Sequence, residues 1–457
     1  MELANIIIPI DIKQYRSNLT LLSYRIMHVK ELKLHNFRGI RNIHLVFDPK
    51  HNVVVLAGIN GVGKSSILDC INTLIKFHKI VYDTIDTVSE QFYYYFKENL
   101  VRDRDLLLDS DIFLDTNNTV NQIKVEFNSH DLEWKIAKFK QDNGNKLWND
   151  IHKESMNIIA TNRKDTHQKP QGAESLSKEP LTNSCFYYLS NRQAIDLMAP
   201  IRMGAEYIID FEDFSRWFKE VENLENEQRL SDDIEYRNPI LTAVRHAIYS
   251  LLGDGYSNFT FKRAIDKMTI KKSGREIALE LLSDGEKSLI AMVGHLSRKL
   301  AEYNENLQNP LQASALVLID EIELHLHPAW QRMIIPRLTK TFPNCQFIVT
   351  THSPQVLSHV DPECIHILDY DGDNVVVKRP DSSYGLDSNR ILEDILGVSK
   401  RPQEIQERMS ELFRTINNND LDSAKEIVRE LGNKIGISEP ELVKAEATIK
   451  RREIIGR

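Results

Sequence analysis

This chain of 457 residues lacks the features that mark several large classes of protein. Its four cysteines (Cys70, Cys185, Cys345 and Cys364) are far apart and form no C-x-x-C pair, so neither a disulfide framework nor a cysteine-based zinc site is indicated. No apolar run is as long as a membrane span, and the run at residues 5–10 is too short for a signal peptide and follows no basic stretch. We therefore expect a cytoplasmic protein without a membrane partner.

An excess of positive charge is also missing. The chain has 58 Lys and Arg against 66 Asp and Glu, a formal net charge of −8, which argues against a surface that binds nucleic acid throughout. One segment, residues 262–275, is locally basic. We interpret it as a β-hairpin with solvated lysines that turns at Ser273-Gly274, since no aromatic residues are interleaved to stack on bases.

What is present is a phosphate-binding loop. Gly58-Ile-Asn-Gly-Val-Gly-Lys-Ser65 matches G-x-x-x-x-G-K-[ST] in full, after an apolar run at 53–57 that predicts a buried strand and before apolar residues at helical spacing. In such a loop the backbone N–H groups and the helix N-terminus favour phosphate oxygens. We predict that Lys64 reaches the β- and γ-phosphates and that Ser65 holds Mg²⁺. The predicted nucleotide contacts are Gly58, Asn60, Gly61, Gly63, Lys64, Ser65 and Ser66.

Two further apolar runs end in residues that suit nucleotide hydrolysis. Residues 315–321 predict a buried strand that carries Asp320 to the Mg²⁺ and Glu321 to the attacking water, where Glu321 acts as a general base. Residues 346–352 predict another buried strand, which presents His352 beside the γ-phosphate. The site is thus predicted to combine three separate parts of the chain.

A fourth segment, Leu282-Ser-Asp-Gly-Glu-Lys287, is a weak signal by itself because Ser and Asp are ordinary helix caps. It follows a strand-like segment at 277–281 and precedes a helix that we expect to begin near Ser288. The segment lies between the other motifs in the chain, and this position supports a role in the same site.

In this order the segments resemble the ABC-class ATPases of the RecF, SMC and OLD type. The resemblance spans roughly residues 27–380 and rests on Asn36-Phe-Arg-Gly39, residues 58–65, 282–287, 315–321, 323–328 and 351–352. It implies an α/β fold: a two-lobed ABC-type ATPase head with a mixed sheet around the phosphate loop. It also implies that two copies sandwich ATP between them.

The resemblance assigns further site residues. Ser283 and Gly285, with Glu286 in the same signature segment, would contact the γ-phosphate held by the partner copy. Arg38 would touch the nucleotide, and Gln193 would sense the Mg²⁺ held by Ser65 and Asp320.

A second interpretation exists for Glu323, His325 and His327, because a His-x-His pair on a strand chelates metals. The resemblance places these residues instead in the loop after the catalytic strand, where head-to-head contacts form. Pro328 would then begin a helix at its first turn. We favour the loop over the metal site.

Alternating patterns predict the remaining strands. Residues 28–39 and 45–47 predict strands, 122–127 with 132–139 predict a hairpin, and 365–368 with 374–377 predict a second hairpin. The acidic stretch at 369–373 is interpreted as the turn of that second hairpin rather than as a nuclease centre.

The domain organisation follows from these elements. Residues 1–26 are a peripheral extension, and Met27 is a candidate natural start. The head comprises residues 27–384, with a mobile polar insertion at 142–180 and a helical subdomain at 205–252 whose aromatic face is core. Residues 385–457 form a tail of short helices. We expect the second of these to run from about Leu421 to Leu431, and the third to begin with a capping box at Ser438.

The absence of two features narrows the choice among the branches of this ATPase class. An SMC protein needs long heptad segments between the halves of its site, and residues 66–281 have none. An OLD nuclease carries a nuclease domain after the histidine loop, where this chain has only about a hundred residues. The head with its helical tail resembles the PtuA family, the ATPases of Septu and some retron anti-phage systems. That resemblance implies a separate HNH endonuclease as partner.

We therefore predict an ATP- and Mg²⁺-dependent ATPase of an anti-phage system that forms homo-oligomers through its heads. It would regulate an HNH endonuclease and reach DNA through that complex, with no nuclease centre of its own. The tail would serve either packing and dimerisation or nuclease docking. Two alternatives remain: a RecF-like clamp that grips duplex DNA with steep salt dependence, and a regulatory scaffold that scarcely hydrolyses ATP.

Overall fold

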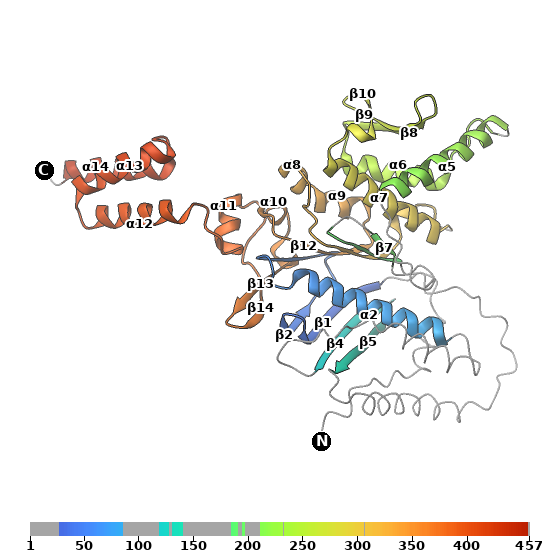
Figure 1. Cartoon of the computed structure of the whole chain (residues 1–457), viewed down its shortest axis with the longest axis horizontal. Helices are drawn as coiled ribbons and strands as arrows, with labels where there is room; N and C mark the ends of the chain where they lie inside the picture. The colour runs from blue at the N-terminus through green and yellow to red at the C-terminus, as the bar shows by residue number, and fades with distance from the viewer. Residues whose placement is uncertain are drawn as a thin grey trace, which may run out of the picture. The chain divides into compact units, whose positions relative to one another are not determined.

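The computed structural model describes residues 27–85, 118–127, 130–139, 184–190, 194–196, 211–231, 233–305 and 307–455. The chain divides into two compact units between Leu386 and Asp387, where the sequence suggested a boundary after residue 384. We call these parts the head unit and the tail unit (Figure 1). The predicted extension at 1–26 and insertion at 142–180 lie outside the described residues.

A seven-stranded sheet lies at the centre of the head unit, in the order β14-β13-β3-β12-β11-β6-β7. Strands β13, β3, β12, β11 and β6 are parallel, and β14 and β7 pair antiparallel at the two edges. Strands β3, β11 and β12 are buried along their whole length, as is typical of parallel strands covered on both faces. The bounds are β3 Val53–Gly58, β6 Ser184–Tyr188, β7 Ala194–Asp196, β11 Ala315–Ile319, β12 Cys345–Thr351, β13 Ile365–Asp371 and β14 Asn374–Lys378.

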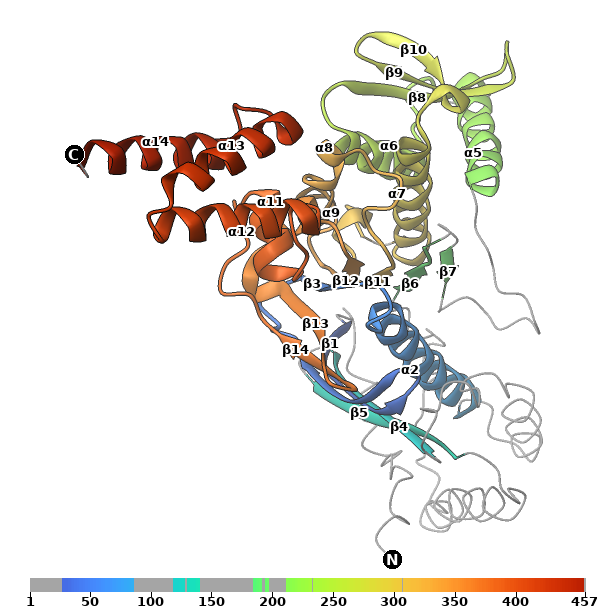
Figure 2. The same ribbon diagram turned by 60° about the vertical axis from the view of Figure 1, so that its left-hand side comes forward.

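The two faces of this sheet carry different layers. On one face, helix α2 (Lys64–Ile85) and a four-stranded antiparallel sheet join alternate strand residues such as Val54 and Leu316 in one hydrophobic core. On the other face, helix α7 (Asp284–Tyr303) packs His295 against Tyr188 of β6. Figures 1 and 2 show α2 and α7 on opposite sides of the sheet.

The antiparallel sheet has the order β2-β1-β4-β5, with bounds β1 Met27–Phe37, β2 Ile40–Val46, β4 Asn118–Phe127 and β5 His130–Phe139. The first predicted strand and the hairpin of β4 with β5 are confirmed. The prediction for 45–47 was wrong in extent: β2 already begins at Ile40, because a tight turn at Arg38-Gly39 pairs Phe37 directly with Ile40.

A second core lies in the part of the head unit that includes α7. Phe214, Phe218 and Phe259 are buried in it, and Trp217 packs against it, so the predicted aromatic face is core. The predicted turn at Ser273-Gly274 is also confirmed, with φ of 51° and 78°. The elements are α5 Phe211–Ser231, α6 Pro239–Leu252, β8 Tyr256–Lys262, β9 Lys267–Lys272, β10 Arg275–Ala278 and η2 Leu279–Leu281.

Two boundaries in this region differ from the prediction. The strand expected at 277–281 ends at Ala278, and Leu279–Leu281 form a 3₁₀ turn. The helix expected near Ser288 begins at Asp284, because Ser283 and Glu286 form a capping box. The signature residues after Ser283 therefore lie in the first turn of α7 and not in a loop before it.

Short helices connect the remaining strands. They are η3 Pro310–Gln312, α8 Pro328–Gln331, α9 Ile334–Thr341, α10 Pro354–Leu357 and η4 Pro362–Cys364. Pro328 occupies the first position of α8, as predicted. The predicted hairpin of β13 with β14 is confirmed, and Gly372 takes a φ of 59° at its turn.

The tail unit consists of α11 Ser388–Arg390, the π-helix η5 Ile391–Ile395, α12 Gln403–Asn417, α13 Leu421–Ile435 and α14 Pro440–Ile455. Helices α12, α13 and α14 enclose a core of their own, which includes Met409, Leu412 and Ile416. The predicted end of the second helix was wrong. Helix α13 continues past Gly432 and ends before Gly436, which has a φ of 93°.

The α/β fold class is confirmed: a mixed sheet around the phosphate loop, two hydrophobic cores in the head unit, and a helical tail. Among the described helices, none combines the length and the apolar character needed to cross a membrane.

A buried ionic network holds α5 to α6 and β8. Arg245 donates to Glu222 at 2.6 Å and to Glu225 at 3.0 Å, and both carboxylates are almost fully buried. Glu222 also accepts from the Thr260 hydroxyl and the Phe261 N–H. Removing the guanidinium would leave two buried carboxylates without their counter-ion.

We predict that Arg245→Ala lowers the free energy of unfolding by about 3–5 kcal/mol, the usual cost of breaking a buried ion pair. Urea unfolding followed by circular dichroism measures this. The matched control is Arg216→Ala, which removes an exposed pair with Asp213 and should cost less than about 1 kcal/mol. Equal effects of the two variants would contradict this account of the network.

Candidate nucleotide site

The phosphate loop connects β3 to α2. Gly58, Gly61 and Gly63 have φ of 146°, 83° and 101°, values that side chains with a Cβ rarely adopt. A Cβ on Gly58 would lie 2.3 Å from the carbonyl oxygen of Leu368, and one on Gly63 would lie 3.1 Å from Ile40. The loop can therefore run this close to β13 and β2 only because these positions are glycine.

Lys64, the first residue of α2, is buried with its ammonium group turned back into the loop. Its Nζ donates to the carbonyl oxygens of Gly58 at 2.8 Å and Ile59 at 2.9 Å. Burial lowers the pKa of Lys64, and the nearby carboxylates of Glu323 and Asp320 oppose that shift. The lysine thus lies where the loop meets a group of acidic side chains.

Asp320 joins the three strand ends. Its Oδ1 accepts from the Ser65 hydroxyl at 2.9 Å and from the Thr350 hydroxyl at 2.6 Å. The Thr350 oxygen in turn accepts from the Glu321 N–H at 2.7 Å. Because β12 lies next to β11, the Thr350 hydroxyl links the Asp320 carboxylate to the backbone of Glu321, while Ser65 bonds to Asp320 directly.

Glu321, the second residue after β11, has a φ of 48°, a left-handed conformation that is uncommon for a residue with a side chain. The N–H of the next residue, Ile322, donates to the carbonyl oxygen of Thr350 at 3.1 Å. These backbone contacts fix the turn in which Glu321 lies half-buried beside the site.

His352 follows β12 and is half-exposed, with its ring against a buried carboxylate. Its Nδ1 lies 3.0 Å from Oε1 of Glu323, and its backbone N–H donates to the same oxygen at 2.8 Å. The structure therefore places Lys64, Ser65, Asp320, Glu321 and His352 after the ends of three neighbouring strands, β3, β12 and β11, and their roles stay predictions.

Arg38 lies in the turn after β1 and forms an ion pair with Asp69 of α2. The Tyr187 hydroxyl donates to the other oxygen of Asp69 at 2.8 Å. Burial and the Asp69 carboxylate raise the pKa of Tyr187, so this hydroxyl stays protonated and remains a donor. Arg38 is thereby held against the second turn of α2, the helix that follows the phosphate loop.

Most of the other predicted nucleotide contacts lie on the loop or at the start of α2. Asn60 and Gly61 are exposed on the loop, and Ser66 is half-buried on α2. Tyr370 of β13, an exposed residue, donates its hydroxyl to the Gly61 carbonyl at 3.0 Å. Gln193 lies outside the described residues.

The signature segment forms a separate network. Glu286 accepts from Lys272 Nζ and from the Ser283 hydroxyl, each at 2.8 Å, and from the Tyr256 hydroxyl. Gly285 faces the loop between β11 and α8, since a Cβ there would lie 2.4 Å from the His325 carbonyl oxygen. Among the described contacts, the Ser283 side chain bonds to Glu286, Glu286 bonds to β8 and β9, and neither side chain bonds to the phosphate loop of the same chain.

The interpretation of Glu323, His325 and His327 as metal ligands finds no support in their contacts. Glu323 bonds to His352, and His327 Nδ1 caps α8 by accepting from the Ala329 N–H at 3.2 Å. His325 has a φ of 62° and packs its backbone against Gly285. The side chains of Glu323 and His327 are thus committed to different neighbours.

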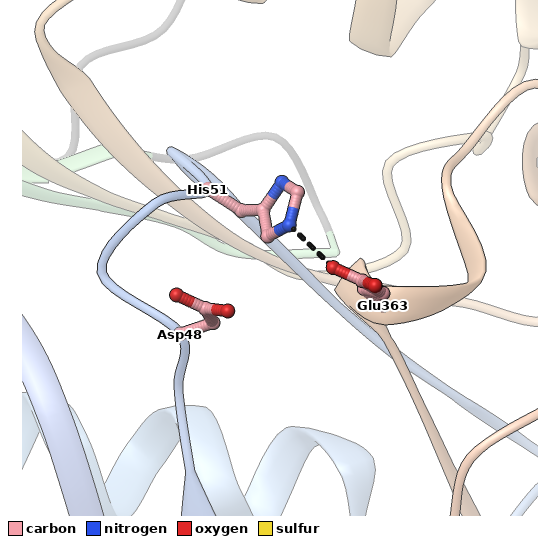
Figure 3. A group of neighbouring side chains, drawn as sticks. All are labelled: Asp48, His51 and Glu363. Carbon is pink, nitrogen blue, oxygen red and sulfur yellow. Dashed lines mark hydrogen bonds and ion pairs between the residues drawn. The ribbon is translucent and has the colours of Figure 1, made fainter.

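Another group of potential metal ligands lies on the surface. Asp48, His51 and Glu363 offer ligand atoms within 4.8 Å of one another, and His51 bonds to Glu363 at 3.1 Å (Figure 3). Glu363 is largely exposed. Exposed groups of this kind are common without a bound ion, and we assign no metal-binding role to this one.

Sequence reasoning missed several residues of the site: Glu323 as the partner of His352, Thr350 as the bridge between strands, and the pair of Asp69 with Tyr187. The pattern Thr350-Thr351-His352 marked a strand end, but the sequence does not say which hydroxyl faces Asp320. Glu323 was visible only as part of a metal or interface pattern.

A comparison with known protein families assigns this chain to one of them. Residues 53–358, more than half of the sequence, match the family described as "AAA domain, putative AbiEii toxin, Type IV TA system". The chain belongs to this family.

Individual relatives are named as ATPases and as Septu proteins. "Retron Ec83 probable ATPase" from Escherichia coli is 41% identical over 39% of this chain and only 32% of its own length. "Retron Vc95 probable ATPase" from Vibrio cholerae is 27% identical over 75% of this chain and 73% of its own length. "Septu protein PtuA" from Bacillus thuringiensis is 26% identical over 81% and 85%. These relatives confirm the predicted relation to PtuA.

Among solved structures, the SMC head domain from Thermotoga maritima is similar over 78% of this chain and 100% of that domain. Its identity is 15% and its TM-score is 0.37.

The signature network gives a prediction about pH. Burial by itself would raise the pKa of Glu286, but the hydrogen bonds from Lys272, Tyr256 and Ser283 outweigh it and lower this pKa from 4.5 to about 2. A carboxyl whose pKa is lower in the folded state stabilises the fold at pH above 4.5, and this stabilisation is lost as the pH falls through 2.

We therefore expect Glu286→Gln to lower the free energy of unfolding at pH 7, by on the order of 3 kcal/mol at most. The difference from the wild type should shrink as the pH falls from 4.5 towards 2. Urea unfolding at a series of pH values measures it. A difference that does not change with pH would show that the charge of Glu286 is not what stabilises this network.

Proposed function

We propose that this chain binds and hydrolyses ATP with Mg²⁺ as an ABC-class ATPase. The observation that carries the proposal is the contact of Ser65 with Asp320 at 2.9 Å, with Lys64 buried beside them. A hydroxyl at the start of α2 and a carboxylate directly after β11 form the kind of oxygen donor set that Mg²⁺ prefers. The loop glycines and the N-terminus of the 22-residue helix α2 suit a polyphosphate.

Each residue then has a role. Lys64 exchanges its bonds to Gly58 and Ile59 for phosphate oxygens, while Ser65 and Asp320 hold the ion, with Gln193 as a further ligand. Bound Mg²⁺ would neutralise charge on the phosphate oxygens. Glu321 orients and deprotonates the attacking water, and His352 contacts the transferred phosphate.

The signature segment completes the site of a second copy. Ser283 is exposed at the N-terminus of α7, where a capping hydroxyl and free backbone N–H groups suit a phosphate. Its hydrogen bonds within the chain leave it apart from the phosphate loop of its own copy. We assign Ser283, Gly285 and Glu286 to a site shared between two head units, with Arg38 contributing to nucleotide binding within one copy.

The biological setting is an anti-phage defence system. The relatives named retron ATPase and Septu PtuA support it, since they match most of this chain. We assign to the chain an HNH endonuclease partner that cuts DNA under control of the nucleotide state, with the tail unit as the docking or dimerisation element. This assignment rests on the relation to PtuA.

The ATPase proposal predicts that Lys64→Ala abolishes ATP binding, because the buried ammonium is lost. It predicts that Glu321→Gln retains binding but lowers turnover by about 100-fold or more, because an amide cannot accept a proton. Phosphate release and fluorescent-nucleotide binding measure the two steps. Glu321→Gln should also accumulate as an ATP-bound dimer on light scattering. Turnover at the wild-type rate in this variant would refute the assignment of the base.

The partner proposal predicts that the chain co-purifies with an HNH endonuclease encoded beside it, and that the mass of the assembly changes with ATP. Lys64→Ala, compared with and without ATP, controls for nucleotide-independent association. If the chain stays free of such a partner and grips duplex DNA only with ATP, with binding that weakens steeply in salt, it is a RecF-like clamp. Binding of ATP without turnover would indicate a regulatory scaffold.

A further inference from the structure

Glu323 is a buried carboxylate at the edge of the nucleotide site that the proposed mechanism does not use. Its side chain is 6% exposed, although it lies in a loop between Glu321 and α8. Two backbone bonds shape this loop: Leu324 N–H donates to the Glu321 carbonyl and Leu326 N–H to that of Glu323, each at 2.9 Å. The loop thus turns Glu323 inward, whereas the sequence resemblance placed it among head-to-head contacts.

One oxygen of Glu323 holds His352 twice. Oε1 accepts from the backbone N–H at 2.8 Å and lies 3.0 Å from the ring Nδ1. A carboxylate beside Nδ1 requires the proton to be on that nitrogen, which leaves Nε2 as the ring atom available to a ligand. The contact also fixes the ring plane of a side chain that is 45% exposed and would otherwise be mobile.

The second oxygen of Glu323 and the charge of its carboxylate relate the Glu323–His352 pair to the phosphate loop. Oε2 of Glu323 is buried without a hydrogen-bond partner. Among the charges that act on Lys64, that of Glu323 has the largest effect, ahead of Asp320 and Glu321. Buried polar atoms are usually hydrogen-bonded, whereas this carboxylate leaves one oxygen unbonded and its charge acts on the lysine of the phosphate loop.

We propose that Glu323 is a positioning residue, which sets the tautomer and orientation of His352 so that Nε2 faces the transferred phosphate. The inference rests on the proposed ATPase function. Glu323 itself contacts no reacting atom in this scheme, and it acts through His352.

The test is a double-mutant cycle on ATP turnover. We expect Glu323→Ala to lower kcat by about 10- to 100-fold, the usual effect of removing a carboxylate behind a functional histidine, with KM for ATP changed by less than about threefold. Glu323→Ala combined with His352→Ala should be no slower than His352→Ala alone. Effects that multiply in the double variant would overturn the proposal.

Two variants refine this cycle. Glu323→Gln keeps an oxygen that accepts from the same two N–H groups, so its kcat should exceed that of Glu323→Ala. Equal loss in both would overturn the role of the hydrogen bond. Glu363→Ala is the matched control, since it breaks a Glu–His pair with His51 outside the site and should leave kcat unchanged.

A spectroscopic measurement separates this proposal from the proposed function. ¹⁵N-histidine NMR, with His352→Ala to assign the signal, should show His352 protonated at Nδ1, and Glu323→Ala should shift this signal towards a mixture of tautomers. An unshifted signal refutes the proposal even if the protein is an ATPase. If Lys64→Ala and Glu321→Gln both retain full turnover, the ATPase proposal fails, while the NMR result still decides whether Glu323 sets the state of His352.

Discussion

The site depends on the parallel pairing of β3, β12 and β11. Parallel strands end at the same edge of a sheet, so the residues that follow them are neighbours although they are far apart in the chain. Here that edge brings Ser65, Asp320 and Thr350 into one hydrogen-bonded group. Because β12 lies in the middle, one threonine hydroxyl can satisfy Asp320 and the backbone of Glu321 together. The loss of this register would separate the phosphate loop from the acidic residues.

A second constraint connects the two faces of the sheet. The carbonyl oxygen of Tyr188, at the end of β6, accepts from the Asp320 N–H at 2.9 Å. The Tyr188 hydroxyl lies 3.0 Å from Nδ1 of His295 on α7. Burial lowers the pKa of His295 to about 3, so this imidazole is neutral at physiological pH. The helix that begins with the signature segment is therefore packed onto the strand whose carbonyl oxygen holds the backbone of Asp320.

Elements with strong local signals were predictable. Glycines at 58, 61 and 63 could be recognised because a phosphate loop needs φ values that other residues resist. Hairpins at Ser273-Gly274 and Gly372 followed from turn chemistry. The start of α7 was placed too late because residues 282–287 were taken as a segment before the helix, whereas Ser283 with Glu286 three residues later forms the capping box that marks the helix start. Gly432 was read as a helix end, although the helix continues to Ile435 and Gly436 follows it.

The sequence by itself determined which kinds of side chain follow each buried strand: a lysine and serine after β3, two carboxylates after β11, and a histidine after β12. Only the tertiary structure decided which of them face one another. Strand β12 is buried along its whole length, so it shows no alternation of buried and exposed residues from which the direction of Thr350 could be derived. Nor does a loop sequence show that Glu323 turns inward to hold His352. That arrangement arises from strand order and from backbone bonds between residues that are distant in the chain.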